Sequence, residues 1–431
     1  MKRERHNDDE KEDRLSDLSE CVLLHILSFL SAKQAVQTCI LSKRWNNLWK
    51  LLPTLRLSSS NFDTPDGFTQ FTTKILSLRD YSTTLYYLRF SSEDLVNPQL
   101  CILNRAVSQN LQRLRISLLY YKIHILDCIF SCHTLTSLQL YVRHPNATTL
   151  FPNSLNLPAL TDLSLRRFVF RSGNNGRAEP FSALEKLNSL SIQFCKVLDA
   201  ENLSISSATL TNLTIQTKQG RNYGKIELYT PNLYTFAYAG IPFEKICGSH
   251  LCSVKHVNID AYMRVNNAEP PSNLLSWLKE FTGIKSLKVT LTTLEVLSLV
   301  PNLLKDKFHF LCNLKSLRVK KEGISSGLST TPMLARFARL CNHVLSLVPN
   351  LLKVIFHSLL NLKSLRVKKD GISSGSSNTM VDGKFVRLSV RCQEEVDKFR
   401  KAIYKEGSPA IPDDIVVFLL QNSPSAKSSY H

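Results

Sequence analysis

The chain contains 431 residues, of which 43% are hydrophobic and 21% charged, so it can hold a small N-terminal module and one large domain. Its apolar runs are too short to span a membrane and residues 1–14 are charged rather than signal-like, so we expect an intracellular protein, in the nucleus or cytoplasm, with no membrane partner. The formal net charge of +19 favours acidic proteins or nucleic acid without specifying either, and because no nucleic-acid-binding motif accompanies it, nucleic acid is not the expected partner.

Two apolar stripes distinguish the first predicted helix, which runs to about Leu30. Each stripe has the spacing i, i+4, i+7. One stripe contains Val22, Ile26 and Phe29, and the other contains Leu23, Leu27 and Leu30. Because an ordinary amphipathic helix has a single stripe, the second stripe predicts that a partner protein covers part of this helix.

Three serines predict where three short helices begin. Ser19 or Asp17 can cap the first helix, Ser31 the second and Ser42 the third, before Pro53 ends the helical segment. The helices follow one another closely, so they predict a compact three-helix module.

Segment 13–57 resembles the plant-type F-box. The residues that carry the resemblance are Asp13, Leu15, Ser16, Leu18, the run 26–30, Lys33, Thr38, the run 41–45, Leu48 and Trp49. The resemblance implies docking on a Skp-family adaptor, which connects an F-box protein to a cullin and a RING subunit. It also implies an adaptor-binding set, in which the last two residues lie closer to the helical core: Leu15, Leu18, Leu23, Leu24, Leu27, Leu30, Leu41 and Trp45.

One departure from the F-box pattern lies at the start of the first helix. The family usually has Leu-Pro where this chain has Leu18-Ser19. Serine offers a capping hydroxyl but leaves the backbone more flexible than proline does. We therefore expect adaptor binding to survive in a weakened form. The alternative is that the helices merely cap the domain that follows.

One pattern of three leucine-type residues recurs throughout the rest of the chain. Two other residues separate the first from the second, and one residue separates the second from the third. Copies begin at Leu52, Leu85, Leu111, Leu135, Leu160, Leu187, Leu210, Leu233, Val254, Ile284, Leu314 and Leu362. From Leu111 to Val254 they begin 21–27 residues apart, which is the period of leucine-rich repeats. Each copy predicts one strand, and stacked copies share a core. The expected fold class is α/β: a three-helix F-box, then a leucine-rich-repeat solenoid with a curved parallel sheet.

An internal duplication lies near the end of the repeats. Segments 297–327 and 345–375 differ at only five of 31 positions, whereas other neighbouring repeats share only their leucines. After it, a strand near 384–391 and helices near 393–405 and 412–420 predict a small α+β cap. The expected boundaries are a disordered N-terminus over 1–12, the F-box over 13–57, the solenoid over 58–375, the cap over 376–421 and a frayed tail over 422–431. Plant F-box proteins with leucine-rich repeats often end in a domain called FBD, and the cap occupies its position.

The residues between the leucines of each strand are expected on the open, concave face of the sheet. Small uncharged residues dominate the middle of this face, and basic residues its C-terminal end. The candidate substrate-binding residues there are Lys288, Arg318, Lys320, Arg366 and Lys368. An acidic or phosphorylated substrate segment could dock on them. The alternative is that these charges only solvate an exposed sheet.

The sequence contains no motif that is typical of an enzyme. A Gly-rich phosphate loop, a metal-ligand spacing and a nucleophile motif are all missing, so we expect no catalytic residues, no metal site and no cofactor. The eleven cysteines lack CxxC pairs and are expected to be reduced.

The resemblance and the repeats together imply a function. The leading hypothesis is a non-catalytic substrate-recognition subunit of a Skp–cullin–F-box ubiquitin ligase, whose repeats bind the target protein. One alternative is an F-box receptor in which a small molecule fills the open face of the repeats. Another is an interaction scaffold outside any ligase.

Overall fold

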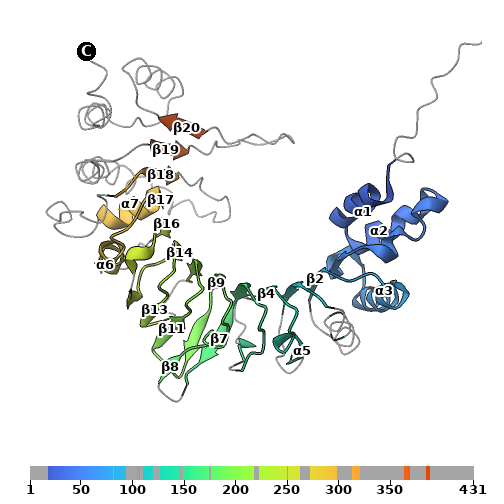
Figure 1. Ribbon diagram of the computed structural model, residues 1–431, viewed down its shortest axis with the longest axis horizontal. Helices are drawn as coiled ribbons and strands as arrows, with labels where there is room; N and C mark the ends of the chain where they lie inside the picture. Colours follow the sequence, from blue (N-terminus) through green and yellow to red (C-terminus); the bar gives the residue numbers. More distant parts are fainter. Residues whose placement is uncertain are drawn as a thin grey trace, which may run out of the picture. The chain divides into compact units, whose positions relative to one another are not determined.

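The computed structural model describes part of the chain (Figure 1). The chain divides into two compact units. The described residues are 18–80, 82–93, 104, 106, 110–119, 127–144, 149–152, 154–173, 176–217, 223–249, 251–262, 272–298, 313–320, 364–368 and 385–388. The first unit extends to Thr149 and includes Ser154–Leu160, and the second contains Leu150–Asn153 and the chain from Thr161 onward.

The first unit begins with short helices and 3-10 turns. They are α1 (Glu20–Phe29), α2 (Ala32–Gln37), η1 (Thr38–Ile40), η2 (Lys43–Trp45) and η3 (Leu48–Leu51). The predicted third helix is therefore two separate 3-10 turns, because Asn46 and Asn47 interrupt it and asparagine competes with helical hydrogen bonding through its side chain. Trp45 and Trp49 are buried, as the core of the module requires.

The helix caps differ from one another. Ser31 forms a capping box at α2: its Oγ accepts from the Gln34 backbone N–H, and the Gln34 side chain accepts from the Ser31 N–H at 3.1 Å. Ser19 occupies the cap position of α1, but its hydroxyl lies 3.0 Å from Cys21 Sγ and makes no side-chain cap hydrogen bond. The sequence thus predicts the position of the first cap correctly, but the expected side-chain hydrogen bond is not formed.

Four parallel strands of the first unit follow the helices. They are β1 (Thr54–Ser58), β2 (Tyr87–Ser92), β3 (Arg113–Leu118) and β4 (Ser137–Val142), paired in this order. Leucines at one register position stack through the unit and are almost completely buried: Leu55, Leu88, Leu114 and Leu138. The connections contain η4 (Ser59–Asn61), α3 (Pro65–Leu78) and α5 (Asp127–Phe130).

The second unit continues the same strand pattern. Its main strands are β6 (Asp162–Arg166), β9 (Ser189–Gln193), β12 (Asn212–Gln216), β14 (Thr235–Gly240), β16 (His256–Ala261), β17 (Ser286–Thr290), β18 (Ser316–Lys320), β19 (Ser364–Lys368) and β20 (Phe385–Leu388). They pair in this order, all parallel except for the antiparallel pair β19–β20. The chain is thus an N-terminal set of short helices followed by a parallel-strand solenoid of stacked coils, which confirms the predicted α/β class.

Additional strands form where the chain returns between coils. A small sheet contains β7 (Phe168–Arg171) paired with β10 (Lys196–Leu198), and a four-stranded sheet has the order β15 (Lys245–Ser249), β13 (Lys225–Tyr229), β11 (Asn202–Ser206) and β8 (Arg177–Ala178). The short strand β5 (Thr149–Leu150) lies where the two units divide. Later returns contain η6 (Leu251–Ser253), α6 (Ser272–Glu280) and α7 (Leu291–Ser298). The leucine pattern predicts none of these strands.

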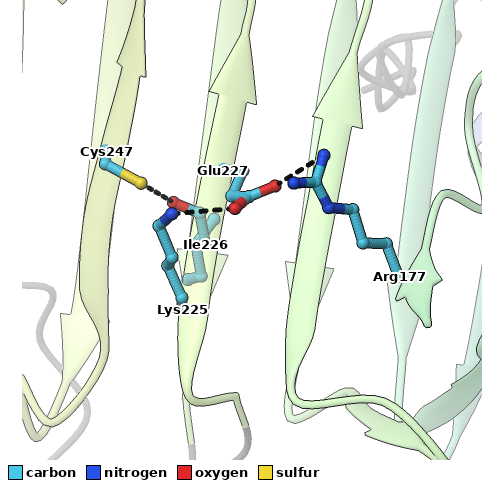
Figure 2. A network of polar contacts seen from close by, with 5 residues as sticks. All are labelled: Arg177, Lys225, Ile226, Glu227 and Cys247. Atoms are coloured by element: carbon cyan, nitrogen blue, oxygen red, sulfur yellow. Dashed lines mark hydrogen bonds and ion pairs between the residues drawn. The ribbon is translucent and has the colours of Figure 1, made fainter. Parts of the chain in front are cut away.

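A buried carboxylate on β13 is bridged to β8 in the four-stranded sheet (Figure 2). Glu227 is 3% exposed. Its carboxylate accepts a 2.8 Å hydrogen bond from Lys225 Nζ and lies 3.5 Å from Arg177 Nη1. The hydrogen bond to Glu227 raises the pKa of Lys225. Because two cations converge on this carboxylate, its charge is compensated on the return side of the solenoid.

Several expectations fall at the edges of the description. The predicted strand near 384–391 is present as β20, whereas the N-terminal segment 1–12, the helices near 393–405 and 412–420, and the tail 422–431 lie outside the described residues. Within the described part, no helix is long and apolar enough to cross a membrane.

Candidate adaptor and substrate interfaces

The two stripes of α1 have opposite environments. Leu23 and Leu27 are 0% exposed and form the core of the helical module, whereas Val22, Ile26 and Phe29 are 40%, 37% and 62% exposed. The expectation that Leu23 and Leu27 face the adaptor is therefore corrected, because these side chains are already covered by their own chain. The stripe of Val22, Ile26 and Phe29 is the one available to a partner.

The other predicted adaptor residues have mixed positions. Leu18, Leu24 and Leu30 are half-buried, and Leu15 lies outside the described residues. Trp45 is buried, as expected for a core residue, but Leu41 is 59% exposed and is not part of the core. Leu41 and its neighbour Ile40, which is 88% exposed, lie at the junction of η1 and η2, where the chain turns at the surface.

Two basic side chains, Arg44 and Lys33, hold the helical module in place. The Arg44 guanidinium donates to the Leu18 carbonyl and so fastens the chain just before α1, where the usual proline is replaced by Ser19. Lys33 donates to the Asn61 carbonyl at 2.7 Å and lies 4.7 Å from the centroid of the Phe62 ring. These contacts join α1 and α2 to the chain around them, so the exposed stripe is presented on a fixed helix.

A buried arginine reinforces the junction between the module and the first coil. Arg79 donates to the Leu52 carbonyl and, at 3.0 Å, to the Thr83 carbonyl. Burial lowers the pKa of this guanidinium from its usual value of 12.5. It stays charged at neutral pH, so both carbonyls keep charge-assisted hydrogen bonds.

The predicted substrate residues are adjacent in the strand register. Lys288 pairs with Arg318 and Arg318 with Arg366, and Lys320 pairs with Lys368. Lys288 and Arg318 are exposed; the side chains of Arg366 and Lys368 lie outside the description. The structure thus brings all five backbone positions to neighbouring strands at one end of the sheet.

One position that the pattern assigned to the open face is buried. Thr290 hydrogen-bonds Asp260 Oδ1 at 3.1 Å, and its hydroxyl also lies 2.8 Å from Thr293 Oγ1. The difference arises because α7 begins immediately after β17 and covers the end of the strand.

A second group of basic residues lies at the other end of the repeats. Arg56, Arg89 and Arg115 occupy the same column of β1, β2 and β3, and Arg113 lies two residues before Arg115. These four residues (Arg56, Arg89, Arg113 and Arg115) form an arginine ladder that was not predicted as a site, although Arg113 and Arg115 were expected on the open face. Reading the open-face columns back into the copies that begin at Leu52 and Leu85 would have found it.

The described cysteines and acidic residues show no sign of a metal or redox site. Among the described residues, no group of three or more His, Cys, Asp or Glu could hold a metal ion. The described cysteines Cys21, Cys39, Cys132, Cys195, Cys247 and Cys252 are free thiols. Burial raises the pKa of Cys195 to about 12, so this thiol is protonated and unreactive at neutral pH.

Comparisons with known proteins agree with this architecture. Residues 15–57 match the family model of the F-box domain. F-box/LRR-repeat protein 13 of Arabidopsis thaliana is 27% identical over 47% of this chain and 46% of its own length. An F-box/LRR-repeat protein of the same plant is 27% identical over 75% of this chain and 74% of its own length, and an FBD-associated F-box protein is 28% identical over 52% and 47%. The chain thus carries an F-box domain and has plant homologues named for F-box and leucine-rich repeats, although it spans only about half the length of the first.

Proposed function

We propose that this chain, an F-box domain joined to a repeat solenoid, is a substrate-recognition subunit of a Skp–cullin–F-box ubiquitin ligase. In this proposal the F-box docks on a Skp-family adaptor, which connects the chain to the cullin and RING subunits. The repeats hold the target protein, and catalysis belongs to other subunits. The observation that carries the proposal is the exposed apolar stripe of α1, which lies inside the F-box match.

The proposed adaptor face differs from the one expected from sequence. It is centred on Val22, Ile26 and Phe29, with Ile40 and Leu41 as further exposed apolar residues of the same domain. Large apolar side chains left in water on a folded module favour association, because each one buried by a partner contributes up to about 2 kcal/mol. Leu23 and Leu27 support this face from beneath.

The proposed substrate surface includes the basic C-terminal end of the sheet. Lys288 and Arg318 are exposed side by side on β17 and β18, and Lys320 lies two residues beyond Arg318 on the same strand. Such a group attracts acidic or phosphorylated segments. The proposal therefore assigns the two functions to separate parts of the chain, an apolar face for the adaptor and polar columns for the substrate.

The test is co-purification of the intact chain with a Skp-family adaptor and a cullin. We expect the Ile26→Asp/Phe29→Asp variant to lose adaptor binding while its thermal melting stays close to that of the unsubstituted chain, because both side chains already face water. The matched control is Leu198→Asp/Tyr229→Asp, which changes two exposed apolar residues of the second unit and should leave adaptor binding intact. Failure of the intact chain to bind any Skp-family adaptor would overturn the proposal.

A further inference from the structure

We propose that the arginine ladder on β1–β3 is a docking surface for an extended peptide segment rich in carboxylate or phosphate groups. The proposal deepens the proposed function, on which it rests for the biological role of that peptide, because it names a substrate chemistry and a second place to bind it. The site is distinct from the basic residues on β17–β19.

The strand register places the arginines next to one another. Arg56 is the register partner of Arg89, and Arg89 is the register partner of Arg115. Adjacent strands stand about 4.8 Å apart, so the three side chains leave the sheet at successive steps of that spacing. Arg113 lies on the same face, since residues two apart on a strand point the same way.

The strands of the ladder and the neighbouring strand β4 carry no counter-charge. β1–β4 contain no Asp or Glu, and none of the four arginines forms an ion pair with any described residue. The basic residues of the return sheet differ from the ladder, because Lys225 and Arg177 converge on the carboxylate of Glu227 (Figure 2). Like charges in adjacent positions of a sheet are destabilising, so an anion that bridges the ladder would relieve a repulsion as well as form hydrogen bonds.

Neighbouring tyrosines hold two of the guanidinium groups. The Arg115 guanidinium carbon lies 5.0 Å from the centroid of the Tyr141 ring, and that of Arg113 lies 5.5 Å from the Tyr86 ring. The Tyr141 hydroxyl in turn lies 3.3 Å from Gln139 Oε1. Stacking of this kind restricts the guanidinium before a ligand arrives and leaves its edge free for paired N–H donation to an oxyanion.

The composition of the face favours a peptide over nucleic acid. Only four cations are present, and the other open-face residues of these strands are uncharged: Thr54, Ser58, Tyr87, Ser91, Ser117, Ser137, Gln139 and Tyr141. Nucleic-acid binding usually neutralises more phosphates and stacks bases on free aromatic rings. Here Tyr86 and Tyr141 already stack with arginines. Planar guanidinium groups also match the bidentate geometry of carboxylates and phosphates.

The test measures fluorescence anisotropy of labelled probes with the full chain at moderate salt. The probes are a decapeptide of alternating Glu and Gly, a decapeptide of alternating phosphoserine and Gly, and an oligothymidylate. The variant Arg89→Gln/Arg115→Gln removes two members of the ladder and should not unfold the sheet, since it relieves repulsion. The charge-matched control is Arg171→Gln/Lys196→Gln, which removes two exposed cations from β7 and β10.

We expect saturable binding of at least one peptide, weakened about tenfold in Arg89→Gln/Arg115→Gln and unchanged in the control. Stronger binding of the glutamate or of the phosphoserine peptide would identify which oxyanion the surface prefers. Equal peptide affinity in all three proteins would overturn the proposal, as would tighter, ladder-dependent binding of the oligothymidylate.

The same variants separate this proposal from the proposed function. Co-purification with a Skp-family adaptor should be unchanged in Arg89→Gln/Arg115→Gln, because the ladder lies outside the exposed stripe of α1. A chain that binds the adaptor but neither peptide would refute the docking surface alone. A chain that binds a peptide through the ladder but no adaptor would refute the ligase role and leave the surface standing.

Discussion

Helix α1 and strand β4 have equally regular apolar patterns but bury them to different extents. On β4, Leu138 and Leu140 are completely buried and the alternate residue Gln139 reaches solvent. On α1, Leu27 is completely buried but Ile26, an equally apolar neighbour, is more than one-third exposed. The strand therefore buries all the apolar residues of its pattern within the chain, whereas the helix buries only one of its two stripes.

The difference reflects what each element has beside it. A coil of the solenoid contacts the coils before and after it, so every inward leucine finds a partner in the same chain. On helix α1, Leu23 and Leu27 pack against other residues of the same chain. The stripe of Val22, Ile26 and Phe29 is exposed to solvent. This exposed apolar surface is the one that we propose a partner chain covers.

The largest expected effect comes from shortening one buried leucine in each region. Leu27→Ala and Leu138→Ala should each cost about 3 kcal/mol of local stability, because both leave a cavity in a closed core. Hydrogen exchange of peptides that cover α1 and β4 in the full chain would measure the loss. Ile26→Ala and Gln139→Ala are the matched controls and should cost less than about 1 kcal/mol. Equal losses for Leu27→Ala and Ile26→Ala would contradict the assignment of the two stripes.

A smaller effect is expected where two return strands approach closely. A Cβ atom on Gly248 would lie 2.1 Å from the Leu228 carbonyl oxygen, its register partner on β13. Gly248→Ala should therefore force the backbones apart and cost about 2 kcal/mol. Faster hydrogen exchange over 223–249 would show it. Ser249→Ala, on an exposed residue of the same strand, should leave exchange unchanged; protection retained in both variants would mean that the strands can separate without loss.

The smallest effect concerns a local signal rather than packing. Ser31→Ala removes one half of the capping box of α2 and should cost about 1 kcal/mol. Ser31→Asp keeps an acceptor at the cap and should retain most of the stability. Exchange rates over 32–37 would compare the two variants. If Ser31→Ala were neutral, packing alone would hold α2, and the helical module would resemble the solenoid more closely than we infer.

The sequence predicted the main strands because their period of two is tied to burial. The leucine triplet that begins at Leu111 becomes β3, and the column that contains Arg113 pairs with Ser137 as expected. The choice between the stripes of α1 was not predictable in the same way, because both have helical spacing and only packing decides which is covered. The return strand β13 was missed because its apolar residues Ile226 and Leu228 do not follow the triplet.

The arginine ladder escaped for a related reason. Arg56 and Arg89 are far apart in the sequence, in the copies of the pattern that begin at Leu52 and Leu85. Only strand pairing makes them neighbours. Register can be predicted once all copies are aligned, but the stacking of Arg115 on Tyr141 depends on side-chain directions that periodicity does not encode.

The duplicated strands β18 and β19 share the same five residues, SLRVK, and lie side by side in register. During folding, β17 therefore meets two identical candidates, and neither hydrogen bonding nor side-chain fit can tell them apart. Loop closure favours the nearer one, Ser316–Lys320, by only about 0.9 kcal/mol. Synthesis from the N-terminus adds a second bias, because the nearer strand leaves the ribosome first. Both biases favour the nearer strand, which is the one that pairs with β17 in the structure.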